Sequence, residues 1–165
     1  SVAVILGHTG EEHARRMDAH AVSDADRGFC AAFEACAVPP ADFSHEAHVR
    51  VAYVYLASLD VDAAVLRMRS ALQTYIEHHR IPPAKYHETL TRAWVLAVRH
   101  FMDRAPSDSA SDFIAKHPQL LDSAIMLTHY SAAVLYSEDA RAAFVEPDLA
   151  PFPQPLSGAA SKQGA

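Results

Sequence analysis

The sequence predicts an all-α protein: an up-and-down helix bundle of four main helices, with shorter helices towards the ends of the chain. Apolar residues recur at intervals of three and four along most of its 165 residues, which is the period of an amphipathic helix. The alternation typical of strands is nearly absent, and only 5 residues are glycine. Half of the residues are hydrophobic, so the length and composition fit one globular domain with a substantial core.

Prolines and helix-capping residues divide the helical pattern into segments. We expect the four main helices over residues 44–59, 61–79, 86–104 and 119–136. Shorter helices are expected over 24–36, 112–116 and 138–144. The resulting organisation is a peripheral N-terminal helix in residues 1–23, the bundle in residues 24–152, and a flexible C-terminal tail in residues 153–165.

Charge and composition narrow the classes of partner. The formal net charge of −6 argues against a nucleic-acid-binding protein, for which a basic face is typical. No apolar run reaches the roughly 20 residues of a membrane span. Cys30 and Cys36 lie six residues apart on one predicted helix and would face different directions, so two buried free thiols are expected rather than a disulfide. We therefore expect a cytoplasmic protein.

Five histidines are predicted to meet at one end of the bundle. His45 and His48 lie at the start of the first main helix, and His87 lies at the start of the third. His79 and His129 lie at or near the ends of the second and fourth. Because short connections favour antiparallel neighbours, these starts and ends share one end of the bundle. The remaining histidines (8, 13, 20, 78, 100 and 117) are expected at the surface.

Converging imidazoles indicate a metal site, since neutral imidazole is the commonest protein ligand of metals. The expected ligands are His45, His48, His87 and His129, holding a divalent transition metal of the group Zn, Fe, Cu, Ni or Mn. Glu88 is the candidate general base or additional ligand, and Tyr86 and Tyr130 are candidate proton donors. Whether Glu88 or His79 joins the ligands stays open.

The same residues carry a resemblance to a family of proteins. The segments Phe43–Tyr53 and Lys85–Trp94, with His129-Tyr130-Ser131, resemble an uncharacterised family of small, mostly bacterial helical proteins with the pattern F-x-H-x-x-H … Y-H-E-T-x-T-x-x-W … H-Y-S. Val49 and Tyr53 depart from that pattern, in which leucine and tryptophan stand. The resemblance implies a shared helical fold and a shared site at the four histidines, and it implies no activity.

Three functions are compatible with these residues. The first is a metal-dependent enzyme, hydrolytic or oxidative, that acts on a small molecule. The second is a metal-free acid–base isomerase, lyase or cyclase that uses His87 and Glu88. The third is a non-enzymatic helical module that binds a metal or a partner. A homodimer is compatible with each of them.

Overall fold

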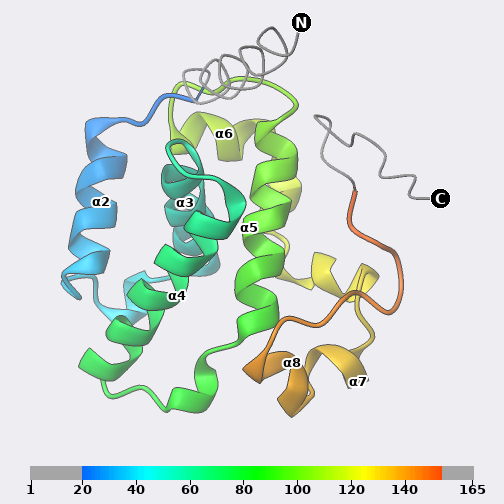
Figure 1. Ribbon diagram of the computed structural model, residues 1–165. Helices are drawn as coiled ribbons and strands as arrows, with labels where there is room; N and C mark the ends of the chain where they lie inside the picture. The colour runs from blue at the N-terminus through cyan, green and yellow to red at the C-terminus, as the bar shows by residue number, and fades with distance from the viewer. Residues whose placement is uncertain (1–19, 154–165) are drawn as a thin grey trace, which may run out of the picture.

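The computed structural model describes residues 20–153, which form an all-α bundle as predicted (Figure 1). The predicted helix in residues 1–23 and the predicted tail fall mostly outside these residues. The α-helices are α2 (Asp24–Glu34), α3 (His45–Leu56), α4 (Val61–His78), α5 (Glu88–Met102), α6 (Ala110–Lys116), α7 (Ala132–Leu135) and α8 (Glu138–Ala142). The 3₁₀ helices are η1 (Pro40–Asp42), η2 (Pro83–Lys85), η3 (Pro118–Leu121) and η4 (Ser123–Thr128).

Side chains at the N-termini of the long helices satisfy backbone N–H groups that have no partner within the helix. Ser23, Ser44 and Asp60 do this for α2, α3 and α4. In α5 the cap is His87, whose ring Nδ1 accepts a hydrogen bond from the backbone N–H of Leu90 at 3.1 Å. The helix therefore begins at residue 88, two residues later than predicted, and a candidate metal ligand has a structural task.

Aromatic rings from three segments hold α2, α3 and α4 together. The rings of Phe33 and Phe43 stack with their centroids 4.3 Å apart, and Tyr75 lies 5.2 Å from each. The Tyr75 hydroxyl donates to the carbonyl of Val38 at 2.7 Å. Such aromatic pairs each contribute about 0.5–1.5 kcal/mol beyond the area they bury. This cluster fixes the start of α3 against the last turns of α4.

Helix α5 is the central helix of the fold and buries more than one face. In Figure 1 it runs beside α4 and α3 on one side, with α7 and α8 towards its N-terminal end on the other. Its residue Ala93 faces a smaller apolar cluster with Met126, Tyr130 and Leu135, all nearly inaccessible to solvent. The segment after α6 thus packs against α5, although it forms no long helix.

The predicted continuous helix over residues 119–136 is wrong, because polar residues interrupt it. Pro118 starts η3, and Asp122 then accepts a hydrogen bond from the backbone of Ala124 and begins η4. Ser131 accepts from the backbone of Val134 and begins α7. Short polar side chains compete with helical hydrogen bonds in this way. The backbone is thus broken twice, and the residues that this stretch buries are Leu120, Met126, Tyr130 and Leu135, whereas Leu121 is exposed.

Two further expectations have opposite outcomes. Cys30 and Cys36 are free and buried, as predicted. His20, expected at the surface, is instead only 6% exposed. It lies edge-on to the ring of Tyr53, beside a segment where the backbone N–H of Ala21 donates to the carbonyl of Ser107. His20 therefore belongs to the contact between the chain before α2 and the loop before α6.

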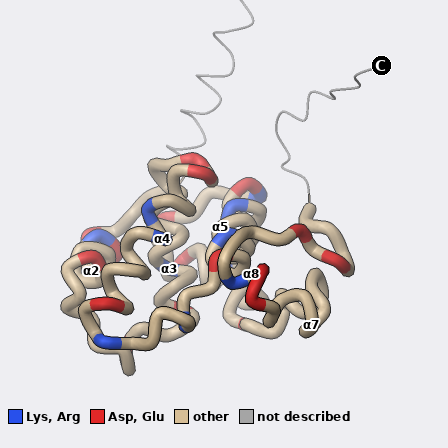
Figure 2. Tube along the Cα trace, turned by 60° about the horizontal axis from the view of Figure 1, so that its bottom comes forward, with Lys and Arg blue, Asp and Glu red and all other residues tan. Residues whose placement is uncertain are grey.

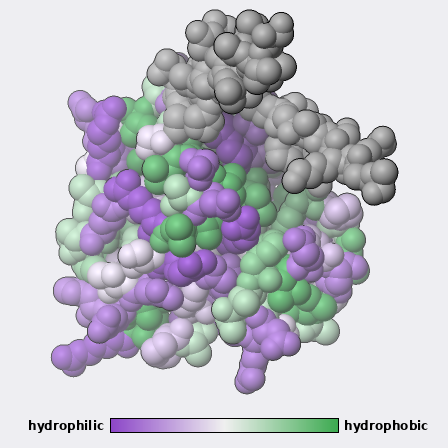
Figure 3. Space-filling model, viewed as in Figure 1, coloured by the Kyte–Doolittle hydropathy of each residue, from purple (hydrophilic) through white to green (hydrophobic). Residues whose placement is uncertain are grey.

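The exterior carries charges of both signs. Basic and acidic residues are interspersed along the tube in Figure 2, and the basic ones form no continuous patch in that view. The face in Figure 3 is mostly hydrophilic, with hydrophobic residues gathered near its centre and lower right. Among the residues described, no helix is both long and apolar enough to cross a membrane.

Candidate functional site

A pocket of about 510 Å³ lies at the end of the bundle where α3 and α5 begin and α4 ends. We call it the imidazole pocket because His45, His48 and His87 line it. The convergence of these three histidines agrees with the antiparallel arrangement inferred from the sequence. Its other walls are mainly apolar and aromatic, and include Phe43, Met68, Leu72, Tyr75, Ile76, Tyr86, Leu90, Thr91, Trp94 and Leu135.

Both ring nitrogens of His87 are engaged by the fold. Nδ1 accepts from the backbone of Leu90, and Nε2 lies 2.6 Å from the carbonyl oxygen of Leu135. A carbonyl only accepts, so Nε2 carries the hydrogen and the ring is neutral. Burial lowers the pKa of His87 and so favours this form, with the nearby positive charge of Arg141 adding to it. His87 offers the pocket a ring face and no free nitrogen lone pair.

His45 and His48, one turn apart on α3, each keep a nitrogen without a partner among the described residues. The Nε2 of His45 donates to the carbonyl of Leu120 at 2.8 Å, and its ring lies 4.3 Å from that of Trp94. The Nδ1 of His48 donates to the carbonyl of Ser44 at 3.3 Å. The remaining nitrogens, Nδ1 of His45 and Nε2 of His48, carry the unused hydrogen-bonding capacity.

His48 is held in its neutral form. Burial lowers its pKa to about 4, and the neighbouring ring of His45 adds to the effect. Protein atoms surround most of the ring, which lies 4.3 Å from Phe43, while its remaining surface faces the pocket. At neutral pH the Nε2 of His48 is therefore an acceptor of hydrogen bonds.

The other two predicted members of the histidine cluster lie elsewhere. His129 lines a separate cavity of about 200 Å³, and its Nδ1 lies 2.7 Å from the carbonyl of Ala150. The ring of His79 is tilted against that of Tyr75, with centroids 4.3 Å apart, and His79 is not part of the pocket wall. Within residues 20–153, no three histidine, cysteine, aspartate or glutamate side chains are grouped closely enough to hold a metal ion.

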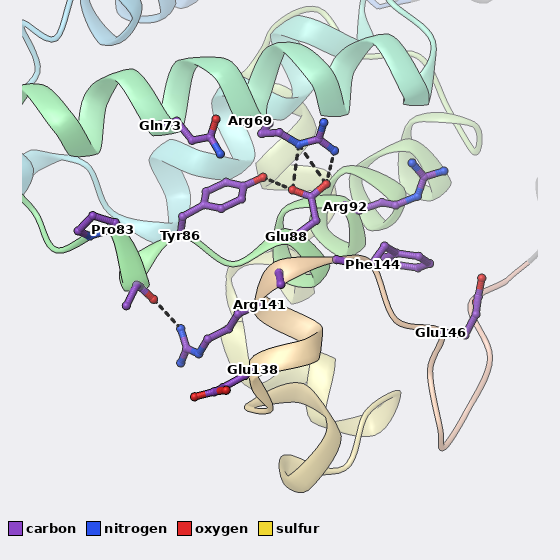
Figure 4. Close-up of a pocket in the computed structure, with 13 residues that line it drawn as sticks. Arg69, Gln73, Pro83, Tyr86, Glu88, Arg92, Glu138, Arg141, Phe144 and Glu146 are labelled. Atoms are coloured by element: carbon purple, nitrogen blue, oxygen red, sulfur yellow. Dashed lines mark hydrogen bonds and ion pairs between the residues drawn. The ribbon is translucent and has the colours of Figure 1, made fainter.

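Glu88 lies outside the imidazole pocket, in an adjacent polar cleft of about 960 Å³ (Figure 4). Its carboxylate accepts hydrogen bonds from the guanidinium of Arg69 on α4 and from the hydroxyl of Tyr86. Burial opposes the charged carboxylate, but these hydrogen bonds outweigh it and lower the pKa of Glu88. Burial, together with the hydrogen bond to Glu88, raises the pKa of Tyr86 to about 12. The three groups thus form a closed ion-pair cluster.

Figure 4 shows two more arginines at the polar cleft, each already engaged. Arg92 pairs with Asp62 at 3.0 Å and covers the ring of Phe144. Arg141 donates to the carbonyl of Ala84 at 2.9 Å. Tyr86 belongs to the walls of both this cleft and the imidazole pocket. It separates the predicted acid–base residue from the predicted histidines.

Tyr130 is fully buried and lines neither of the two sites. Its hydroxyl donates to the carbonyl of Val145 at 2.6 Å, and the residue belongs to the small cluster beneath α5. Burial raises its pKa to about 12, with the charges of Glu146 and Asp148 adding to the effect. The arrangement makes Tyr130 a packing residue that ties the segment after α8 to the bundle.

Sequence reasoning missed several residues of the two sites. Phe43 and Trp94 form aromatic walls of the imidazole pocket, and both stand in the segments that carry the family resemblance. Arg69 was also missed, although it pairs with Glu88. The spacing of apolar residues on α4 could have placed it beside the buried face, but its partner on α5 follows only from the packing of the two helices.

Comparisons of the chain with models of protein families, with curated proteins and with solved structures found no match. The resemblance of the motif segments to the small helical family therefore stays a prediction, and the geometry of the two sites is the basis for any proposed function.

Proposed function

We propose that the protein binds a small, largely apolar molecule in the imidazole pocket. One observation carries the proposal: the pocket is concave, mostly apolar and aromatic, and is lined by two imidazoles that each have one nitrogen without a partner among the described residues. Its volume of about 510 Å³ falls within the range of small-molecule sites, roughly 300–1,000 Å³. A few polar atoms on an apolar wall are the usual means by which such sites orient a ligand.

The protonation equilibria favour binding over acid–base catalysis. A general base works best with a pKa near the working pH. The pKa of His48 is about 4, and the pKa of Glu88 is lowered by Arg69 and Tyr86. Both groups are therefore weak bases at neutral pH. His87, the imidazole assigned to acid–base work from the sequence, has both nitrogens in hydrogen bonds with the backbone.

The NMR signal of a tryptophan in the pocket wall can be used to test binding. Trp94 is the only tryptophan in the sequence and lines the pocket. A fragment library screened by NMR against ¹⁵N-labelled full-length protein should yield compounds that shift the indole N–H signal of Trp94. The compounds that shift it are then titrated to obtain Kd values.

A matched pair of variants locates the binding. Ala52→Leu adds bulk to the wall of the imidazole pocket, and Ala97→Leu makes the same change at the cavity beside His129. The first should weaken binding at least about tenfold, the effect of losing 1.4 kcal/mol, and the second should leave Kd unchanged. Circular dichroism checks that both variants are folded. Equal effects of the two variants, or no compound that shifts Trp94, would refute the proposal.

A metal-dependent reaction on a small molecule is the second candidate function. The free nitrogens of His45 and His48, one turn apart, support it, since such pairs commonly supply two ligands. A third protein ligand would require His87 to leave the carbonyl of Leu135. Elemental analysis of protein purified without a nickel column tests this candidate. A stoichiometric metal that is lost in His45→Ala and kept in His100→Ala would favour it over simple binding.

A further inference from the structure

We infer that the molecule bound in the imidazole pocket is a flat aromatic compound with one hydroxyl or N–H donor directed at Nε2 of His48. This inference rests on the proposed binding function and names the class of ligand. Two independent observations lead to it: the aromatic character of the walls, and the set of polar atoms that the fold leaves unused.

The walls favour a flat ring. Phe43 lies against the ring of His48, and Trp94 lies against the ring of His45, with centroids 4.3 Å apart in both pairs. Tyr75 and Tyr86 add aromatic surface to the same pocket. Aromatic rings attract other rings in offset-stacked and edge-to-face geometries, which an aliphatic ligand cannot use.

The polar atoms of the inner wall are mostly occupied by the protein itself. The hydroxyl of Tyr75 donates to Val38, that of Tyr86 to Glu88 and that of Thr91 to the carbonyl of His87. The hydrogens of these hydroxyls are therefore already used in hydrogen bonds within the protein. The N–H groups of the three pocket histidines likewise donate to carbonyls.

What the inner wall leaves unused is acceptor capacity. With Nδ1 protonated and donating to Ser44, the Nε2 of His48 presents a lone pair. The Nε2 of His45 donates to Leu120, and its Nδ1 has no partner among the described residues. A ligand therefore gains by bringing a hydrogen-bond donor. A carboxylate or phosphate would bring more acceptors. The donors on the pocket wall that have no partner among the described residues, those of Lys85, Ser123 and Tyr136, are all exposed to solvent.

The test compares two compounds of nearly equal shape that differ in the donor: 2-naphthol, and 2-methoxynaphthalene, which keeps the oxygen and lacks the hydrogen. Both are titrated into full-length protein at pH 7.5 while the indole signal of Trp94 is followed by NMR. One hydrogen bond to an otherwise unpaired acceptor predicts a Kd about 5- to 10-fold lower for 2-naphthol.

Variants assign the difference to His48. In His48→Phe, which keeps a flat ring and removes the acceptor, the ratio of the two Kd values should fall to about 1. His48→Gln, which restores an acceptor oxygen, should recover part of the preference for 2-naphthol and covers the case in which the phenylalanine variant is unfolded. His129→Phe, at the separate cavity, should keep the wild-type ratio.

The outcomes separate the two proposals. Equal affinities of wild type for the two compounds, or tighter binding of 2-naphthoate than of 2-naphthol, would overturn the assignment of the donor class and leave the binding function in place. If neither compound moves the Trp94 signal while other fragments do, the aromatic class is wrong. If nothing binds there, both proposals fail.

Discussion

The neutral imidazole of His48 should make the stability of the protein depend on pH. Burial holds its pKa at about 4 in the folded state, whereas an imidazole in the unfolded chain titrates near 6.5. Between these values the unfolded state binds a proton that the folded state does not, so the free energy of unfolding falls as the pH falls through this window. The full shift in pKa lowers the free energy of unfolding by about 2 kcal/mol between pH 7.5 and 5.0. Because the His48 ring is partly exposed to the pocket, the expected loss is ~1–2 kcal/mol.

The comparison with His48→Gln isolates this contribution, because glutamine does not titrate. Urea unfolding followed by circular dichroism at pH 7.5 and 5.0 gives the loss of stability for each protein. The other buried histidines, such as His20 and His87, titrate in both proteins, so their effects cancel in the difference. Wild type should lose ~1–2 kcal/mol more than the variant. Equal losses would mean that His48 is protonated freely in the folded protein, and the argument for a neutral acceptor in the pocket would fail.

Three further substitutions test the fold around the sites, each by urea unfolding at pH 7.5. Phe33→Ala removes a ring with 0% exposure from the centre of the aromatic cluster and should cost about 3–5 kcal/mol; a cost below 1 kcal/mol would contradict the packing described. Asp26→Asn weakens the buried hydrogen bonds to Arg50 and to the backbone of Ala110 and should lower the free energy of unfolding by about 2–3 kcal/mol. The far-UV spectrum of the folded variant should show no loss of helix. Glu88→Gln should lower the free energy of unfolding by only about 1–2 kcal/mol, because Arg69 is 37% exposed and its charge is partly screened by solvent. The Kd values obtained from the Trp94 NMR signal should not change. A loss of binding would place Glu88 in the ligand site.

Much of the fold follows from local sequence signals. Serine and aspartate mark the helix starts at residues 24, 45 and 61 within a residue or two, because capping is a local interaction. The stretch from Pro118 to Tyr136 was mispredicted because its apolar spacing suits a buried helix while Asp122 and Ser131 bind neighbouring backbone N–H groups. Here two local signals disagree, and the packing against α5 decides between them.

The candidate site was predictable in position more than in chemistry. Helical periodicity and short connections placed His45, His48 and His87 at one end of the bundle, and the structure has them around one pocket. The state of each nitrogen depends on contacts between distant segments. His45 meets Leu120 across 75 residues, and His87 meets Leu135 across 48. No spacing rule in the sequence predicts such partners.

The break in the predicted fourth helix and the hydrogen bond of His45 are linked. In a continuous helix over residues 119–136, the carbonyl of Leu120 would accept from the backbone four residues later. The break at Asp122 frees that carbonyl, and the end of α7 leaves the carbonyl of Leu135 free, so each would be buried without a donor if no side chain reached it. His45 and His87 supply those donors. A metal ion bound through Nδ1 of His45 and Nε2 of His48 would leave the bond to Leu120 in place, whereas recruiting Nε2 of His87 would leave the carbonyl of Leu135 without a donor, at a cost of about 1–3 kcal/mol. The way this chain ends its helices thus fixes the rings of His45 and His87 and leaves Nε2 of His48 without a partner among the described residues.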